Sequence, residues 1–79
     1  MNRQEIIKKT NEILVDKLGI GAEEIKETST LRGDFGADSL DEVELIMEFE
    51  KDFGISITDL EAEKVKTVGS IYDLIEQKL

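Results

Sequence analysis

Residues 36–53 read GADSLDEVELIMEFEKDF, and this stretch decides the fold. Its apolar residues recur at the spacing of one turn of a helix. Ser39, followed three residues later by Glu42, is typical of the capping box that begins a helix, and Gly54 is typical of a helix stop. We therefore predict a central helix over residues 40–53 with Ser39 as its N-cap.

Similar patterns predict further helices on both sides of the central one. An N-terminal helix begins at a capping box of Asn2 and Glu5 and stops at Gly19. A brief helical turn follows the central helix, and a last helix begins at Thr67. The long connection before the central helix has no sustained period, and such loops are often functional. We expect residues 1–79 to form one all-α domain, a small bundle of three main helices plus one short helix.

Composition excludes several classes of function. The chain has no cysteine and no histidine, so it lacks a disulfide, a thiolate metal site and the commonest general base. Its apolar runs are too short to span a membrane or to form a signal peptide, so we expect a cytoplasmic location. We also expect the chain to be a monomer. The formal charge of −9 disfavours nucleic acid and anionic membranes as partners. The acidic residues do not follow the spacing of a calcium loop, so we expect no metal site.

The negative charge is concentrated in one third of the chain. Residues 34–63 hold eleven acidic residues and a single basic one, Lys51, whereas the other 49 residues are nearly neutral. An evenly acidic protein would be interpreted as merely soluble, but this imbalance marks one contiguous segment. We predict that this segment forms the binding surface.

The central helix carries more apolar residues than one buried face requires. A helical projection places Leu45, Ile46, Phe49 and Phe53 on one side and a second stripe about 125 degrees away. The second stripe consists of Leu40, Val43 and Met47. It is either additional core or, as we favour, an exposed apolar strip in an acidic rim, which suits transient docking to basic partners.

Ser39 stands where a loop meets this helix, and its residue type allows two interpretations. The simple one is that the hydroxyl only caps the helix, which contributes about 1 kcal/mol. A phosphate ester at the same place would also be favoured, because helix N-terminal amides and the helix dipole attract anions. Residue type alone leaves both open.

A family resemblance makes this motif specific. Gly36-Ala37-Asp38-Ser39-Leu40, followed by Asp41, Val43, Glu44 and Leu45, resembles the phosphopantetheine attachment motif of the acyl carrier proteins of fatty acid synthesis. The resemblance extends to length, acidity and helix order over essentially the whole chain. It implies that a phosphopantetheinyl transferase attaches a 4'-phosphopantetheine arm to Ser39, beside the motif residue Asp38. The thiol of the arm would carry acyl groups as thioesters in a chain that has no cysteine.

The same resemblance implies two further sets of residues. The face that docks on the basic patches of fatty acid synthesis enzymes would comprise Leu40, Asp41, Val43, Glu44, Met47 and Glu50. The cavity for the acyl chain would comprise Leu45, Ile46, Phe49, Ile57, Ala62, Val65, Ile71 and Leu74. Because those positions would be apolar in any core, the second set is the weaker inference.

Three other functions compete with fatty acyl transport. The same serine could carry polyketide or amino acyl units, and the acidic helices could instead bind a basic partner without any modification. An enzyme is the weakest interpretation, because a small bundle offers little concave pocket in which to shift the pKa of a carboxylate. We therefore expect a carrier and not an enzyme.

Overall fold

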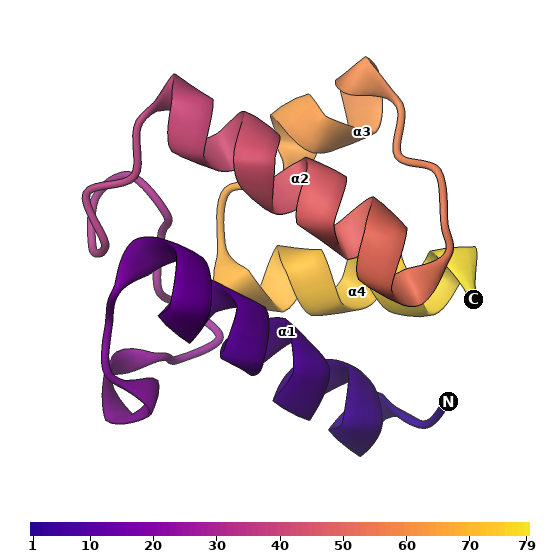
Figure 1. Cartoon of the computed structure of the whole chain (residues 1–79), viewed down its shortest axis with the longest axis horizontal. Helices are drawn as coiled ribbons and strands as arrows, with labels where there is room; N and C mark the ends of the chain where they lie inside the picture. Colours follow the sequence, from indigo (N-terminus) through magenta and orange to yellow (C-terminus); the bar gives the residue numbers. More distant parts are fainter.

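The computed structural model describes all 79 residues and consists of helices joined by loops (Figure 1). The helices are α1 (Arg3–Leu18), the 3₁₀ turn η1 (Ala22–Glu24), α2 (Ser39–Phe53), α3 (Asp59–Lys64) and α4 (Val68–Lys78). This arrangement confirms the predicted all-α bundle of three main helices and one short one. No helix combines the length and the apolar composition needed to cross a membrane.

The ends of α1 follow from the residues that the sequence places there. The Asn2 side chain accepts a hydrogen bond from the Glu5 backbone at 2.9 Å, and the Glu5 carboxylate accepts one from the Asn2 backbone at 3.2 Å. At the other end Gly19 adopts a φ of 65°, and its N–H donates to the Val15 carbonyl at 3.0 Å. Both predicted ends of this helix are therefore confirmed.

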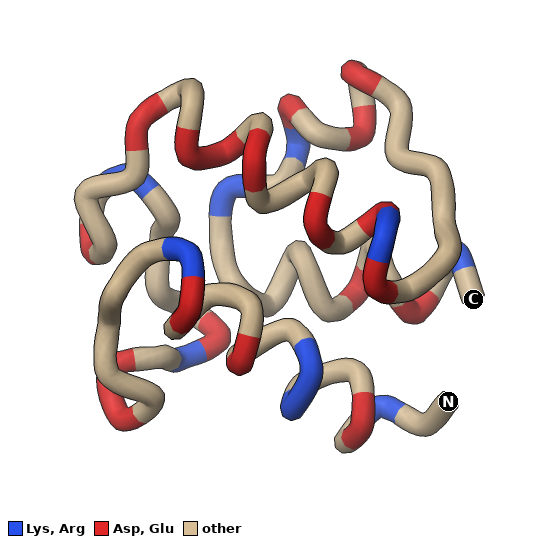
Figure 2. Tube along the Cα trace, in the orientation of Figure 1, with Lys and Arg blue, Asp and Glu red and all other residues tan.

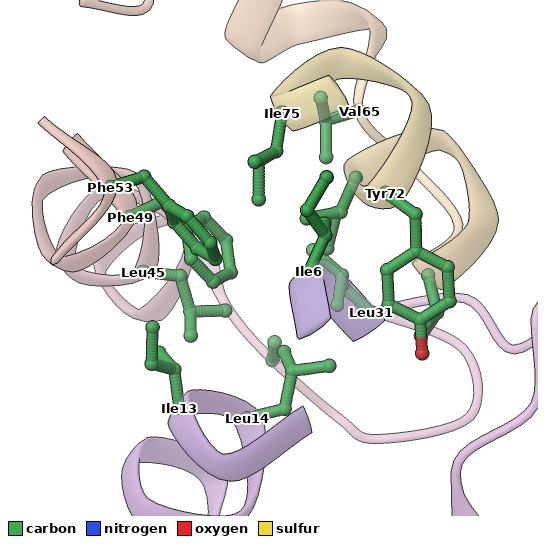
Figure 3. Close-up of a cluster of buried hydrophobic side chains, with 13 residues drawn as sticks. Ile6, Ile13, Leu14, Leu31, Leu45, Phe49, Phe53, Val65, Tyr72 and Ile75 are labelled. Atoms are coloured by element: carbon green, nitrogen blue, oxygen red, sulfur yellow. The ribbon is translucent and has the colours of Figure 1, made fainter. Parts of the chain in front are cut away.

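The hydrophobic core lies where α1, α2 and α4 meet (Figure 3). Each of these helices contributes at least three buried apolar side chains, whereas α3 contributes none. The thirteen core residues are Ile6, Ile13, Leu14, Leu31, Ala37, Leu45, Phe49, Phe53, Val65, Val68, Ile71, Tyr72 and Ile75. The bundle thus has one well-packed side and one side closed only by a short helix.

The long connection between α1 and α2 is fixed to the chain that joins α3 to α4. The Leu31 N–H donates to the Lys66 carbonyl at 3.1 Å, and the Val68 N–H donates to the Ser29 carbonyl at 2.9 Å. The Leu31 side chain is buried in the core. The loop that leads into α2 is therefore held by backbone hydrogen bonds as well as by packing.

The second apolar stripe of α2 is on the surface. Leu40, Val43 and Met47 are 65%, 55% and 62% exposed, so the structure supports the exposed strip and not the additional core. On the opposite side Leu45 and Phe49 are each 1% exposed. Ile46 departs from the prediction, because it lies at the edge of the core and is only half-buried.

Candidate functional site

Ser39 is the first residue of α2 and its side chain is exposed. The N-cap is Asp38: its side chain accepts a hydrogen bond from the Asp41 N–H at 2.9 Å, and the Asp41 carboxylate accepts one from the Asp38 N–H at 3.1 Å. The prediction that Ser39 caps the helix with Glu42 was therefore wrong by one residue. Because Asp38 satisfies the helix end, the Ser39 hydroxyl has no capping role.

A tight turn brings the chain to this position. Gly36 has a φ of 68°, a backbone conformation that side chains disfavour, although a Cβ there would meet no other atom within 4 Å. The Ala37 N–H donates to the Leu31 carbonyl at 2.9 Å, and Ala37 is buried. Glycine is thus needed for the shape of the turn, and Ala37 anchors the turn immediately before the Asp38 cap.

Arg32, on the same turn, contacts the serine. Its Nη2 donates to Ser39 Oγ at 3.1 Å and to Glu42 Oε1 at 2.8 Å, and its Nε donates to Glu42 Oε2 at 3.1 Å. Hydrogen bonding to Glu42 raises the pKa of Arg32 above its usual value, and the charge of Asp38 adds to this. A cation that remains protonated thus lies beside the hydroxyl, in the most acidic part of the chain.

A groove of about 340 Å³ lies between α2 and α3, and Ser39 stands among its lining residues. Val43, Ile46 and Met47 line it from α2, and Ile57 and Ala62 line it from the opposite side. Acidic residues complete the lining, so the groove is apolar along part of its wall and charged along the rest. An apolar chain tethered at Ser39 would have a surface to lie against.

The predicted docking residues occupy one exposed helix, but two of them also have structural contacts. Leu40, Val43, Glu44 and Met47 are exposed, whereas Asp41 and Glu50 are half-buried. Asp41 belongs to the capping box, and Glu50 Oε2 accepts a hydrogen bond from the Ile57 N–H at 2.8 Å. Figure 2 shows the acidic residues that follow α2 along its length.

The eight predicted cavity residues divide into three groups. Ile46, Ile57 and Ala62 line the groove, and Leu74 is half-buried on α4. The other four lie in the closed core, and they are Leu45, Phe49, Val65 and Ile71. The structure therefore brings only three of the eight to the groove beside Ser39.

Sequence analysis missed two features of this region. It did not identify Arg32, because a contact across a turn has no periodic pattern. It also missed Leu60, which is 69% exposed on α3. An apolar residue flanked by acids in a short capped helix was the available signal for Leu60.

Comparison with known proteins agrees with this geometry. Residues 9–75 match the family described as phosphopantetheine attachment site. The chain is 45% identical over 78 residues to the acyl carrier protein of Thermotoga maritima, covering 99% of this chain and 96% of that protein. It is 48% identical over 75 residues to that of Porphyromonas gingivalis, covering 95% and 96%.

Solved structures give the same result for the fold. The acyl carrier protein from Enterococcus faecalis superposes with a TM-score of 0.86 at 33% identity and covers 100% of both chains. The crystal structure of the Thermotoga maritima acyl carrier protein superposes with a TM-score of 0.82 at 35% identity, covering 99% of this chain and 91% of that one.

Fold and site together define a phosphopantetheine-bearing carrier domain. The chain belongs to the acyl carrier protein family. It is a carrier and not an enzyme, and it transports acyl groups on a phosphopantetheine arm in fatty acid synthesis. The interpretation as an unmodified interaction module is set aside by the attachment-site match.

Proposed function

We propose that Ser39 is the residue that carries the arm. The observation that supports this most directly is the exposed hydroxyl at the first residue of α2, beside a groove, in a chain that matches an attachment-site family. Free N–H groups at the start of a helix and the helix dipole favour a phosphate there. Asp38 serves this site as the helix cap, which keeps the serine hydroxyl available.

Attachment is a phosphoryl transfer in which Ser39 Oγ is the nucleophile and coenzyme A is the donor. Ser39 Oγ attacks the phosphorus that bears the pantetheine, so that an Oγ–P bond forms and the P–O bond to the second phosphorus breaks. Adenosine 3',5'-bisphosphate leaves with the bonding electron pair. A base of the phosphopantetheinyl transferase takes the hydroxyl proton, because the partner of Ser39 Oγ in the chain is the donor Arg32 and not a carboxylate. Once attached, the arm supplies the thiol that binds acyl groups.

The docking face proposed for partner enzymes is the exposed strip of α2 with its acidic rim. Leu40, Val43 and Met47 offer apolar contact, and Glu44 offers charge that attracts basic patches on the transferase and on fatty acid synthesis enzymes. Asp41 and Glu50 border this face with part of their carboxylates used internally. We infer a monomer, because such a face must stay free for successive partners. We also propose one carrier domain over residues 1–79, built around a single core, that works in the cytoplasm beside the enzymes it serves.

The acyl chain is proposed to enter the bundle through the groove between α2 and α3. Ile46, Ile57 and Ala62 give the groove its apolar wall. The predicted residues that are now buried, Leu45 and Phe49 among them, would contact the chain only if α2 and α3 separate further. The absence of buried side chains on α3 supports such a movement.

Intact mass spectrometry tests the attachment site. The purified chain is incubated with coenzyme A and a phosphopantetheinyl transferase, and we expect the added mass of one arm. Ser39→Ala should remain folded and gain no mass, whereas the matched control Ser56→Ala, at another exposed serine, should be loaded like the wild type. An arm found on Ser39→Ala would refute the assignment.

A further inference from the structure

An arm on Ser39 creates an electrostatic problem. Its phosphodiester adds a negative charge at a position next to the Asp38 and Asp41 carboxylates of the capping box and close to Glu42. These neighbouring negative charges repel one another, and the positive end of the helix dipole offsets only part of that repulsion. A nearby cation would therefore make the attached state more favourable.

Arg32 is the cation that already contacts this oxygen. It reaches Ser39 Oγ at 3.1 Å while it forms a two-point pair with Glu42. Its side chain is 63% exposed, whereas that of Glu42 is 27% exposed, so the arginine has the freedom to turn and the glutamate is the more fixed partner. The flat guanidinium matches a phosphate group as well as it matches a carboxylate.

Arg32 also borders open space, so its side chain has room to turn. A hollow of about 630 Å³ is lined by Arg32, Glu42 and Lys66 among others, and it shares Glu42 with the groove that contains Ser39. Lys66 is a second cation of this hollow, but no hydrogen bond joins it to Ser39. Arg32 and Lys66 therefore line the same hollow, but only Arg32 forms a hydrogen bond with Ser39.

We propose that Arg32 is the positioning residue of the arm: its guanidinium orients the Ser39 hydroxyl before attachment and pairs with the phosphodiester afterwards, releasing part of its contact with Glu42. This inference rests on Ser39 being the attachment site. During transfer the same group stabilises the charge that develops on the phosphoryl oxygens. Arg32 thus acts on both the rate of loading and the direction in which the arm leaves the helix.

Loading kinetics of four variants test the proposal in the full chain. At saturating carrier, Arg32→Gln should lower kcat of arm transfer about fivefold, as expected for one exposed charge-assisted hydrogen bond, and Arg32→Lys should recover part of it. Glu42→Gln breaks the same ion pair but frees the guanidinium, so its kcat should exceed that of the wild type. Lys66→Gln removes an equal charge from the same hollow and should leave kcat unchanged.

Nuclear magnetic resonance of the loaded protein provides an independent measurement. The Arg32 Nε–Hε resonance should move between the unloaded and loaded wild type, and the ³¹P resonance of the arm should differ between wild type and Arg32→Gln but not between wild type and Lys66→Gln. A purely structural brace would leave the ³¹P resonance unaffected by Arg32→Gln.

Three results would overturn the inference. These are an unchanged kcat in Arg32→Gln, an equal loss in Arg32→Gln and Glu42→Gln, and an Arg32 resonance that stays in place on loading. Each of them leaves Ser39 intact as the attachment site, because mass spectrometry would still find the arm there. A wild type that gains no arm at Ser39 would remove the site and this inference together.

Discussion

The two sides of α2 are held by different interactions. Toward α1 and α4, α2 buries Leu45, Phe49 and Phe53 in the shared core. Toward α3 there is an open groove, and α3 itself has no buried residue. Polar contacts fix α3 instead, including the Thr58 cap and an ion pair between Lys78 and Glu61 at 2.8 Å. Apolar burial is thus concentrated on one side of the helix, and an open groove lies on the other.

The largest test of this contrast is a pair of substitutions two residues apart on α2. Phe49→Ala should lower the free energy of unfolding by about 3–5 kcal/mol, because Phe49 is 1% exposed and its loss leaves a cavity. Met47→Ala should change it by less than about 0.5 kcal/mol, because Met47 is 62% exposed. Chemical denaturation of both proteins measures the difference. Similar losses in the two variants would contradict a two-sided helix.

The exposed side should instead determine partner binding. Glu44→Lys should lower the association rate with the transferase by about tenfold at low salt and less at high salt, because charge steers the encounter. Met47→Ala should act mainly on dissociation, since it removes apolar contact. Stopped-flow binding at two ionic strengths separates these effects. Glu23→Lys, on η1, makes the same charge change away from α2 and should have little influence; an equal effect there would indicate that net charge alone matters.

The start of α2 offers a smaller test, which separates capping from attachment. Asp38→Ala should cost about 1 kcal/mol of stability through loss of the N-cap, whereas Ser39→Ala should cost much less. Thermal unfolding of the unloaded proteins measures both. If Ser39→Ala were the more destabilising change, Ser39 would be supporting the helix end after all.

Periodicity and cap residues were enough to predict the helices, because each main helix has both a clear apolar pattern and a strong start or stop signal. They were not enough to choose between Asp38 and Ser39 as N-cap. Both residue types cap well, and both have an acidic residue three positions later. The exposed strip was predictable because acidic residues surround its apolar ones.

Other parts of the site depend on tertiary geometry that no local pattern encodes. Arg32 meets Ser39 only because Gly36 reverses the chain between them, and neither spacing nor residue type indicates that contact. Ile46 shares the spacing of the core face, yet the gap left by α3 places it in the groove. The residues that line a groove depend on how far two helices stand apart, which is decided by the packing of the whole bundle.

The smallest expected effect concerns the polar attachment of α3. The hydrogen bond from Lys78, followed by those from Thr58, lowers the pKa of Glu61 from 4.5 to about 2. Because the folded-state pKa is the lower one, the contribution of Glu61 to stability is present above about pH 4.5 and is lost as the pH falls toward 2. The protection factors of the α3 amides, which correct for the intrinsic pH dependence of exchange, should therefore fall across this window, while those in the core of α2 change less.

Glu61→Gln removes the titrating group. The amides of α3 should then be less protected from exchange at neutral pH, and their protection should depend less on pH. Glu63→Gln, on the same short helix but exposed, provides the matched control and should retain the wild-type dependence. If both variants kept that dependence, the ion pair with Lys78 would not be what holds α3 in place. The position of α3 would then depend on the Thr58 cap and on the hydrogen bond from the Ile57 N–H to Glu50. A Glu50→Gln variant would weaken that hydrogen bond.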